Sequence, residues 1–273
     1  MNYSIIACDL DGTLLGPDMD VSSENLEAIR KLTEKGIYFV PTTGRAFGEM
    51  PEALRTNPYI RYYINSNGAV IFDKKTGKST TFGIDKRKIN EIMDVLDGFR
   101  TYMTFHADGK SNVDAAKDID EYSTYCHMNN IWTRFVRECN TPKENYSEYI
   151  RSRDEAEMFC VFFDSLNNLQ NGKSLLEDLG GLRISTSAEY NIEIFSEKCG
   201  KGRTLHCLCD MLGVPYSKSM AVGDSMNDVT MLEAAGLGVC VDNALEAVKK
   251  TADLIVCGNE DHVAKYILEN IID

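Results

Sequence analysis

The feature that most constrains the fold is the apolar run at residues 5–8, which ends at two carboxylates, Asp9 and Asp11, followed at once by Gly12. A short apolar run bounded by a turn signal is typical of a strand buried on both faces, as in a parallel sheet. Open α/β sheets bind ligands outside the carboxyl ends of their strands. We therefore expect both carboxylates at a binding edge, the alternative being an Asx-turn that simply ends the strand.

The closeness of these two carboxylates predicts a partner of opposite charge. In a partly desolvated turn each raises the pKa of the other unless a cation neutralises them. Carboxylate and carbonyl oxygens are the ligands that suit Mg²⁺. The pair therefore indicates a hard-cation site with carboxylate chemistry.

Composition favours a globular protein and argues against nucleic acid and membranes as partners. The chain has 273 residues, 43% of them hydrophobic, which allows one or two soluble globular domains. Its formal net charge of −13 argues against nucleic acid and anionic membrane surfaces as partners. No secretory leader or transmembrane run is present, and the nine irregularly spaced cysteines suggest reduced thiols, so we expect a cytoplasmic protein. The oligomeric state is not predicted.

A second expected strand, residues 37–41, ends at Thr42-Thr43-Gly44-Arg45. A threonine hydroxyl and a glycine N–H at such a strand end can bind an anion, although an ordinary strand-to-helix turn has the same composition. Further along, Lys201 stands between two glycines at an expected helix start. That position can project an ammonium group into a cleft, the alternative being a solvated surface lysine.

A third apolar run, residues 219–223, ends at Asp224, with Asn227 and Asp228 close behind. The spacing of the two aspartates predicts a helix that begins here and carries both on one face. Together with Lys201 and the first two strand ends, these groups suit a metal ion and a phosphoryl group. One aspartate would attack phosphorus and another would act as acid and base.

The order of expected elements predicts the domains. Strands at 5–8, 37–41 and 62–65 alternate with helices, which implies a right-handed parallel sheet. This alternation of strands and helices stops at about residue 83 and resumes after residue 187, and we expect an inserted α+β domain between these positions. The remaining segments, 1–82 and 188–273, with a strand at 189–195, form the expected α/β domain with helices on both faces of its sheet.

The motifs resemble those of the haloacid dehalogenase superfamily, and in particular its Cof-type, class IIB phosphatases. The first motif is Asp9-Leu10-Asp11-Gly12-Thr13-Leu14, the second Thr42-Thr43-Gly44-Arg45, the third contains Lys201, and the fourth is Gly223-Asp224-Ser225-Met226-Asn227-Asp228. The resemblance spans nearly the whole chain. It implies a Rossmann-like core and a C2B-type cap inserted between the second and third motifs.

The resemblance also implies roles for single residues. Asp9 would be the nucleophile and Asp11 the acid/base, while Lys201 would steady phosphoryl transfer. The implied phosphate-binding residues are Leu10, Thr43, Gly44, Lys201 and Asn227. The implied Mg²⁺ ligands are Asp9, Asp11 through its carbonyl, and Asp224, with Asp228 supporting metal and phosphate. Arg45, Asn67 and Gly68 lie on core loops that we expect to face the leaving group.

These implications lead to one expected function and two alternatives. We expect a Mg²⁺-dependent phosphatase that acts on a small phosphorylated metabolite, such as a sugar phosphate, through an aspartyl-phosphate. A phosphomutase of the same superfamily would share the motifs. A non-catalytic phosphoacceptor or binding protein also uses acidic strand ends, Mg²⁺ and a lysine, but needs neither an acid/base at Asp11 nor a large cap.

Overall fold

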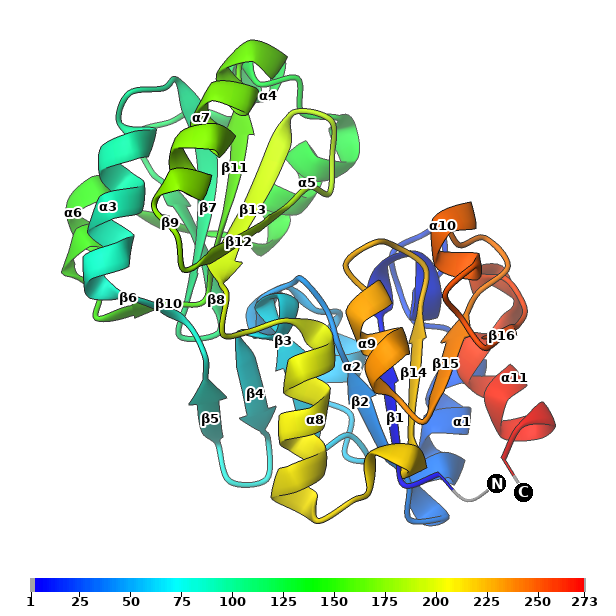
Figure 1. Cartoon of the computed structure of the whole chain (residues 1–273). Coiled ribbons are helices and arrows are strands. Elements are labelled where there is room, and N and C mark those ends of the chain that lie inside the picture. The colour runs from blue at the N-terminus through cyan, green and yellow to red at the C-terminus, as the bar shows by residue number, and fades with distance from the viewer. Residues whose placement is uncertain (1–2, 273) are drawn as a thin grey trace. The chain divides into compact units, whose positions relative to one another are not determined.

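The computed structural model describes residues 3–272, which form two compact units (Figure 1). Within the described residues the first unit comprises residues 3–45, 50–81 and 199–272, and the second comprises 46–49 and 82–198. None of the helices described between residues 3 and 272 has the length and apolar character needed to cross a membrane.

The first unit is built around a five-stranded sheet in the order β16-β15-β14-β1-β2, with every neighbouring pair parallel. Figure 1 shows α8 and α9 on one face of this sheet and α1 and α11 on the other. The predicted α/β fold is therefore confirmed. Its strands and helices, in chain order, are β1 (Ile5–Cys8), α1 (Ser23–Glu34), β2 (Tyr38–Pro41), α2 (Glu52–Arg55), β3 (Tyr62–Asn65), β4 (Val70–Asp73), β5 (Lys78–Thr81), α8 (Lys201–Leu212), β14 (Ser219–Gly223), α9 (Val229–Ala234), β15 (Leu237–Cys240), α10 (Glu246–Lys249), β16 (Leu254–Ile255) and α11 (Val263–Asn270).

Strand β1 occupies the centre of this sheet. Ile5 pairs with Ser219 of β14 on one side and with Tyr38 of β2 on the other. All four of its side chains are buried, including the thiol of Cys8. A continuous apolar run is what a strand covered on both faces requires, so the local sequence and the position of β1 agree.

The expectation for residues 62–65 was wrong in one respect. Strand β3 pairs antiparallel with β4 in a separate sheet, β3-β4-β5, and meets the parallel sheet through a single bridge between Thr42 and Ile64. The cause is the turn at Ser66–Gly68, whose left-handed backbone sends the chain straight back along β3. A local apolar pattern does not show whether a strand joins a parallel sheet or pairs antiparallel with the next strand.

The second unit is an α+β layer. Its six-stranded sheet has the order β12-β13-β11-β7-β8-β9, and a hydrophobic cluster fills the space between this sheet and α3, α6 and α7. Its strands and helices are β6 (Ile84–Asp85), α3 (Lys86–Leu96), β7 (Thr101–Ala107), β8 (Lys110–Asp114), α4 (Ile119–Tyr125), α5 (Asn130–Cys139), β9 (Thr141–Lys143), α6 (Tyr146–Ser152), β10 (Glu155–Ala156), β11 (Met158–Phe163), α7 (Leu166–Asp178), β12 (Leu182–Ser185) and β13 (Asn191–Ser196).

The predicted end of the inserted segment at residue 187 was wrong, because β13 belongs to the second unit. This strand pairs antiparallel with both β11 and β12, and the unit continues to residue 198. Ile192 and Ile194 enter the hydrophobic cluster of that sheet. Their alternation with polar residues fits any half-buried strand, so the pattern did not reveal which sheet would accept it.

Candidate active site

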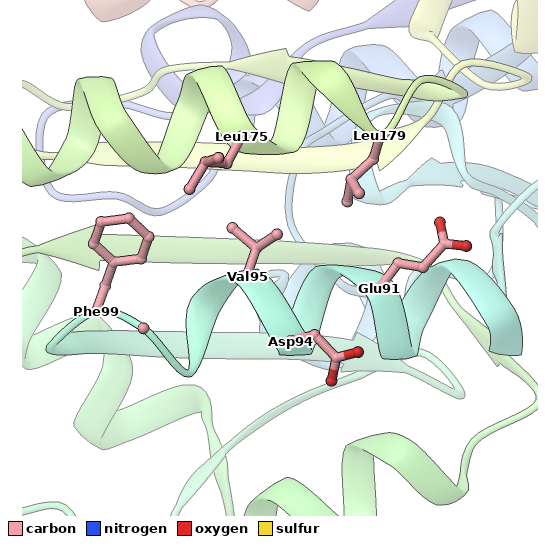
Figure 2. A pocket seen from close by; sticks show the side chains of 7 residues that line it. Glu91, Asp94, Val95, Phe99, Leu175 and Leu179 are labelled. Atoms are coloured by element: carbon pink, nitrogen blue, oxygen red, sulfur yellow. The ribbon is translucent and has the colours of Figure 1, made fainter.

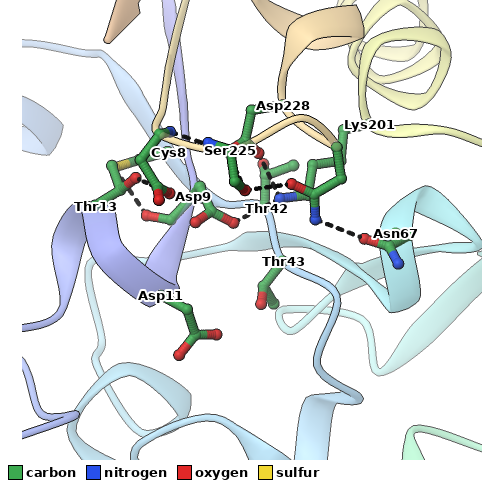
Figure 3. A network of polar contacts seen from close by, with 12 residues as sticks. Cys8, Asp9, Asp11, Thr13, Thr42, Thr43, Asn67, Lys201, Ser225 and Asp228 are labelled. Carbon is green, nitrogen blue, oxygen red and sulfur yellow. Dashed lines mark hydrogen bonds and ion pairs between the residues drawn. The ribbon is translucent and has the colours of Figure 1, made fainter. Parts of the chain in front are cut away.

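Three neighbouring strands of the first unit end in the polar groups singled out from the sequence. Asp9 follows β1, Thr42-Thr43-Gly44-Arg45 follows β2, and the loop 224–228 follows β14. Because β14, β1 and β2 are parallel neighbours, their carboxyl ends lie at one edge of the sheet. Figure 3 shows the side chains of these strand ends gathered there.

Lys201 connects two of the strand ends. Its Nζ lies 2.5 Å from Asp9 Oδ1 and 2.6 Å from Asp228 Oδ1. All three side chains are buried, with 1% of the Lys201 side chain exposed. Lys201 is the first residue of α8, and Gly202 beside it allows the helix to approach the Thr230 backbone, where a Cβ would lie 2.1 Å from the carbonyl oxygen. The alternative that Lys201 is a solvated surface lysine is thus excluded.

The carboxylates at this site outnumber the single ammonium group of Lys201. Burial, and next the nearby Asp228, raise the pKa of Asp9 well above its usual range. Burial and Asp228 also raise the pKa of Asp224, to about 6. Burial lowers the pKa of Lys201, but Asp228 and Asp9 outweigh it and raise the pKa overall. One ammonium group therefore stands among more buried negative charge than it neutralises.

The loop that contains Asp224 and Asp228 is a turn and not the predicted start of a helix, because α9 begins only at Val229. Asp228 Oδ2 accepts hydrogen bonds from the backbone N–H groups of Asp224 and Ser225, both at 3.0 Å. These bonds close the turn and bring the two carboxylates together without a helix. Competition of this kind from a local aspartate is a known reason for helices to begin late.

Asp11 is held apart from this acidic group. Arg45 binds its carboxylate with two parallel hydrogen bonds, Nε to Oδ2 at 2.9 Å and Nη2 to Oδ1 at 2.5 Å. The Arg45 side chain is 9% exposed and that of Asp11 is 42% exposed. The Asp11 carboxylate is therefore fixed in direction yet open to solvent. The predicted contact of Arg45 with a leaving group remains a prediction.

The oxygen atoms of Asp9, Asp224 and Asp228 fit a divalent cation. One carboxylate oxygen from each lies within 4.8 Å of the others. Within residues 3–272, no group donates a hydrogen bond to Asp9 Oδ2 or Asp224 Oδ2, so these two atoms remain available as ligands. Gly12 forms one wall of this space, and a Cβ there would lie 2.6 Å from Asp224 Oδ2. An all-oxygen donor set of this kind suits Mg²⁺.

The remaining predicted residues occupy the same edge in different ways. Thr43 is fully buried, and its Oγ1 accepts the backbone N–H of Arg45 at 3.1 Å. Leu10 begins the turn that follows β1. Gly68 packs against Gly200, where a Cβ would lie 2.6 Å from the carbonyl carbon, so it is enclosed by protein. Their roles in binding phosphate or substrate remain predictions.

Two residues at the site were not assigned a role from the sequence. Thr13 Oγ1 donates a hydrogen bond to Asp224 Oδ1 at 3.0 Å. Ser225 Oγ donates one to Asn227 Oδ1 at 2.7 Å. Both lie inside the motifs already described, where a hydroxyl next to several acidic residues was the available signal, but their partners depend on the fold.

A hollow on the second unit has different chemistry. It lies between α3 and α7, and Figure 2 shows apolar side chains from both helices with carboxylates beside them. The lining residues are Glu91, Asp94, Val95, Gly98, Phe99, Leu175 and Leu179. This lining offers no cation to a phosphate group, so the strand ends of the first unit are the better candidate site.

Comparison with known proteins identifies the family. Residues 6–267 match the family model described as haloacid dehalogenase-like hydrolase. The chain is a haloacid dehalogenase-like hydrolase. This hydrolase is 30% identical to the phosphatase YwpJ of Bacillus subtilis over 286 residues, which covers 98% of this chain and 99% of the relative. The site described above lies within the matched residues.

Two further comparisons agree with this assignment. The hydrolase is 31% identical to the 5-amino-6-(5-phospho-D-ribitylamino)uracil phosphatase YcsE of Bacillus subtilis, with 98% of this chain and 95% of the relative covered. A solved haloacid dehalogenase-like hydrolase from B. subtilis superimposes with a TM-score of 0.82 at 28% identity, covering 98% of this chain and 100% of the other. The fold and the family deduced from the motifs are thus confirmed.

Proposed function

We propose that this hydrolase is a Mg²⁺-dependent phosphatase that removes phosphate from a small phosphorylated metabolite through an aspartyl-phosphate on Asp9. The observation that carries the proposal is the position of Asp9, with Oδ1 held 2.5 Å from Lys201 Nζ and one carboxylate oxygen within 4.8 Å of carboxylate oxygens of Asp224 and Asp228. The phosphatase names of the relatives YwpJ and YcsE support the same class of reaction.

The residues of the chain divide the chemistry between them. The Asp9 carboxylate attacks phosphorus, and the bond between phosphorus and the ester oxygen breaks as Asp11 donates a proton to the departing oxygen. Asp11 then accepts a proton from water that attacks the aspartyl-phosphate, which frees Asp9 and releases phosphate. Arg45 directs the Asp11 carboxylate through its two hydrogen bonds. Lys201 neutralises negative charge on Asp9 and on the transferring group.

Asp9 and Asp224, with the backbone carbonyl of Asp11, would hold the Mg²⁺ ion. When bound, the ion supplies positive charge that keeps Asp9 ionised and reduces its repulsion of the phosphoryl oxygens. Asp228 supports this set, since both of its oxygens already accept hydrogen bonds from Lys201 and the loop backbone. The Thr43 hydroxyl and the N–H groups of Leu10 and Gly44 would bind the phosphoryl oxygens.

The substrate we propose is a phosphate monoester of a small polar metabolite, such as a sugar or polyol phosphate. The name of the relative YcsE specifies a phosphorylated ribityl chain, which is a substrate of this kind. The net charge of −13 disfavours polyanionic partners such as nucleic acid. Asp11 as an acid/base favours turnover over simple phosphate acceptance, and a phosphomutase would return an isomerised phosphosugar instead of free phosphate.

The proposal predicts that a panel of phosphate monoesters yields free phosphate only when Mg²⁺ is present. Removal of the metal with EDTA should lower the rate by at least about 100-fold, because a metal ion contributes several kcal/mol to transition-state charge stabilisation. The measurement is phosphate release from sugar, polyol and nucleoside phosphates, with chromatography of the products. Unchanged rates in EDTA would contradict the metal requirement, and an isomerised phosphosugar would support the phosphomutase.

The pKa of Asp224, raised to about 6, predicts a pH-dependent effect of Mg²⁺ on stability. As the pH rises from about 4 to about 6, the unfolded chain loses this proton before the folded one, so the metal-free fold loses stability. Bound Mg²⁺ offsets that loss. Saturating Mg²⁺ should raise Tm by about 5 °C at pH about 7.5 and by clearly less at pH about 5.

Thermal unfolding at both pH values, with Mg²⁺ or EDTA, tests this prediction. The Asp224→Asn variant is the control, because it lacks the titrating carboxyl and should show a small Mg²⁺ effect at either pH. An equal rise in Tm for the unmodified protein at both pH values would contradict the assignment of Asp224 as a ligand.

A further inference from the structure

The turn between β3 and β4 has an unusual backbone. Ser66, Asn67 and Gly68 have φ angles of 49°, 54° and 92°, three consecutive residues in the left-handed region. Such angles are uncommon for residues other than glycine and persist where the surrounding structure imposes them. Ser66 and Asn67 are almost fully buried. The turn therefore is held in one conformation by its contacts.

Those contacts join the turn to the loop that follows β2. The N–H of Asn67 donates to the carbonyl of Thr43 at 3.1 Å, and the N–H of Ser66 donates to the carbonyl of Arg45 at 3.0 Å. Gly44 lies against the Asn67 amide, since a Cβ there would be 3.1 Å from Asn67 Oδ1. The turn thus fixes the backbone of the residues proposed to bind phosphate.

The Asn67 side chain reaches a different loop. Its Oδ1 accepts a hydrogen bond from Asn227 Nδ2 at 3.3 Å. Asn227 Oδ1 in turn accepts from Ser225 Oγ at 2.7 Å, and the Ser225 N–H donates to Asp228 Oδ2 at 3.0 Å. Asp228 accepts from Lys201, which also binds Asp9. A continuous series of hydrogen bonds therefore runs from Asn67 to the proposed nucleophile.

These bonds specify the orientation of the Asn227 amide. Its oxygen faces Ser225 and one of its N–H groups faces Asn67 Oδ1, so a flipped amide would place oxygen against oxygen and lose the bond to Asn67. The second N–H on Nδ2 has no protein partner within the described part of the chain and remains available to an anion. Asn227 would be ready to bind a phosphoryl oxygen before substrate arrives, which lowers the cost of ordering it during the reaction.

We propose that Asn67 is a positioning residue for phosphoryl transfer, which acts by orienting Asn227 relative to the loop at Thr43 and Gly44. This inference rests on the proposed function and adds to it. Asn67 itself is 2% exposed and its side chain accepts a hydrogen bond from Asn227, so in this proposal it acts through that amide and not by contact with the leaving group.

The Asn67→Gly variant tests the proposal. Glycine accepts a φ of 54° without strain, so the fold should be retained and Tm should change little. We expect kcat for p-nitrophenyl phosphate to fall by about 10- to 100-fold, the scale of a misplaced binding group, with a smaller change in KM. Asn67→Gly with an unchanged kcat would contradict the inference.

A double-mutant cycle separates positioning from a purely structural role. If Asn67 acts through Asn227, then Asn67→Gly added to Asn227→Ala should change kcat by less than about twofold. If Asn67 only supports the backbone turn, the same substitution should lower kcat by the same factor in both backgrounds. That outcome would overturn the proposal.

Binding of orthovanadate with Mg²⁺, measured by calorimetry, gives a readout that does not need turnover. The unmodified protein should bind vanadate, and Asn67→Gly should bind it about 10-fold or more weakly. Equal binding by both would contradict only the role of Asn67. An unmodified protein that neither binds vanadate nor releases phosphate would contradict the proposed function, and this inference with it.

Discussion

Asp9→Asn is expected to abolish phosphate release while leaving the fold at least as stable as before. The amide cannot attack phosphorus, so kcat should fall by about 10⁴-fold or more, the scale seen when a nucleophile is removed. Stability should be unchanged or higher in EDTA, because the substitution removes one of several buried carboxylates gathered around one ammonium group. A gain in stability on loss of function is common at such sites.

Initial rates with p-nitrophenyl phosphate and Tm in EDTA measure both effects. Asp154→Asn is the matched control, since that side chain is 95% exposed and should affect neither quantity. Asp9→Ala should be equally inactive. Full activity in either Asp9 variant would contradict the assignment of Asp9 as the nucleophile. A large fall in Tm for Asp9→Asn would contradict the excess of buried carboxylates over the Lys201 ammonium group.

Lys201→Met is expected to have the opposite effect on stability at the same site. It leaves Asp9 and Asp228 buried without the cation that both contact at 2.6 Å or less. Removal of one partner from a buried ion pair typically costs about 3–5 kcal/mol, so the free energy of unfolding should fall by about that amount. Activity should fall by at least about 100-fold, because the transferring group loses a preorganised charge.

Urea unfolding in EDTA and initial rates measure these effects. Lys86→Met is the matched control, because its ion pair with Asp154 is exposed and should contribute less than about 1 kcal/mol. The double variant Asp9→Asn/Lys201→Met should recover part of the lost stability, since it removes one of the uncompensated carboxylates. Equal losses for Lys201→Met and Lys86→Met would contradict the buried ion pair.

The fold was largely predictable because local patterns report strand ends directly. Apolar runs that stop at Asp9, Thr42 and Asp224 marked the three strands that meet at the candidate site, and the motifs pointed to the correct family. Pairing was harder to predict. The antiparallel return of β3 depends on the left-handed turn at Ser66–Gly68, and the sheet that accepts β13 depends on contacts far along the chain.

The side-chain geometry of the site could be predicted only in part. Sequence order cannot show that Arg45 forms hydrogen bonds with the Asp11 carboxylate or that Asn227 donates a hydrogen bond to Asn67. Each pair joins loops that are far apart in the sequence. At Asp228 the side-chain carboxylate accepts a backbone N–H of the same loop, and α9 begins only at Val229 instead of at the predicted Asp224. The chemistry follows from residue types, whereas the orientation of each group follows from tertiary contacts.

The central place of β1 has a consequence for biosynthesis. Residues 5–8 pair with residues 219–222, so the ribosome must produce most of the polypeptide before this strand acquires its second neighbour. Until then an apolar β-edge stays unpaired, which is the kind of nascent surface that chaperones shield. The candidate active site can therefore assemble only after translation has passed the β14 segment, and a shorter product would carry the proposed nucleophile without the loop that contains Asp224 and Asp228.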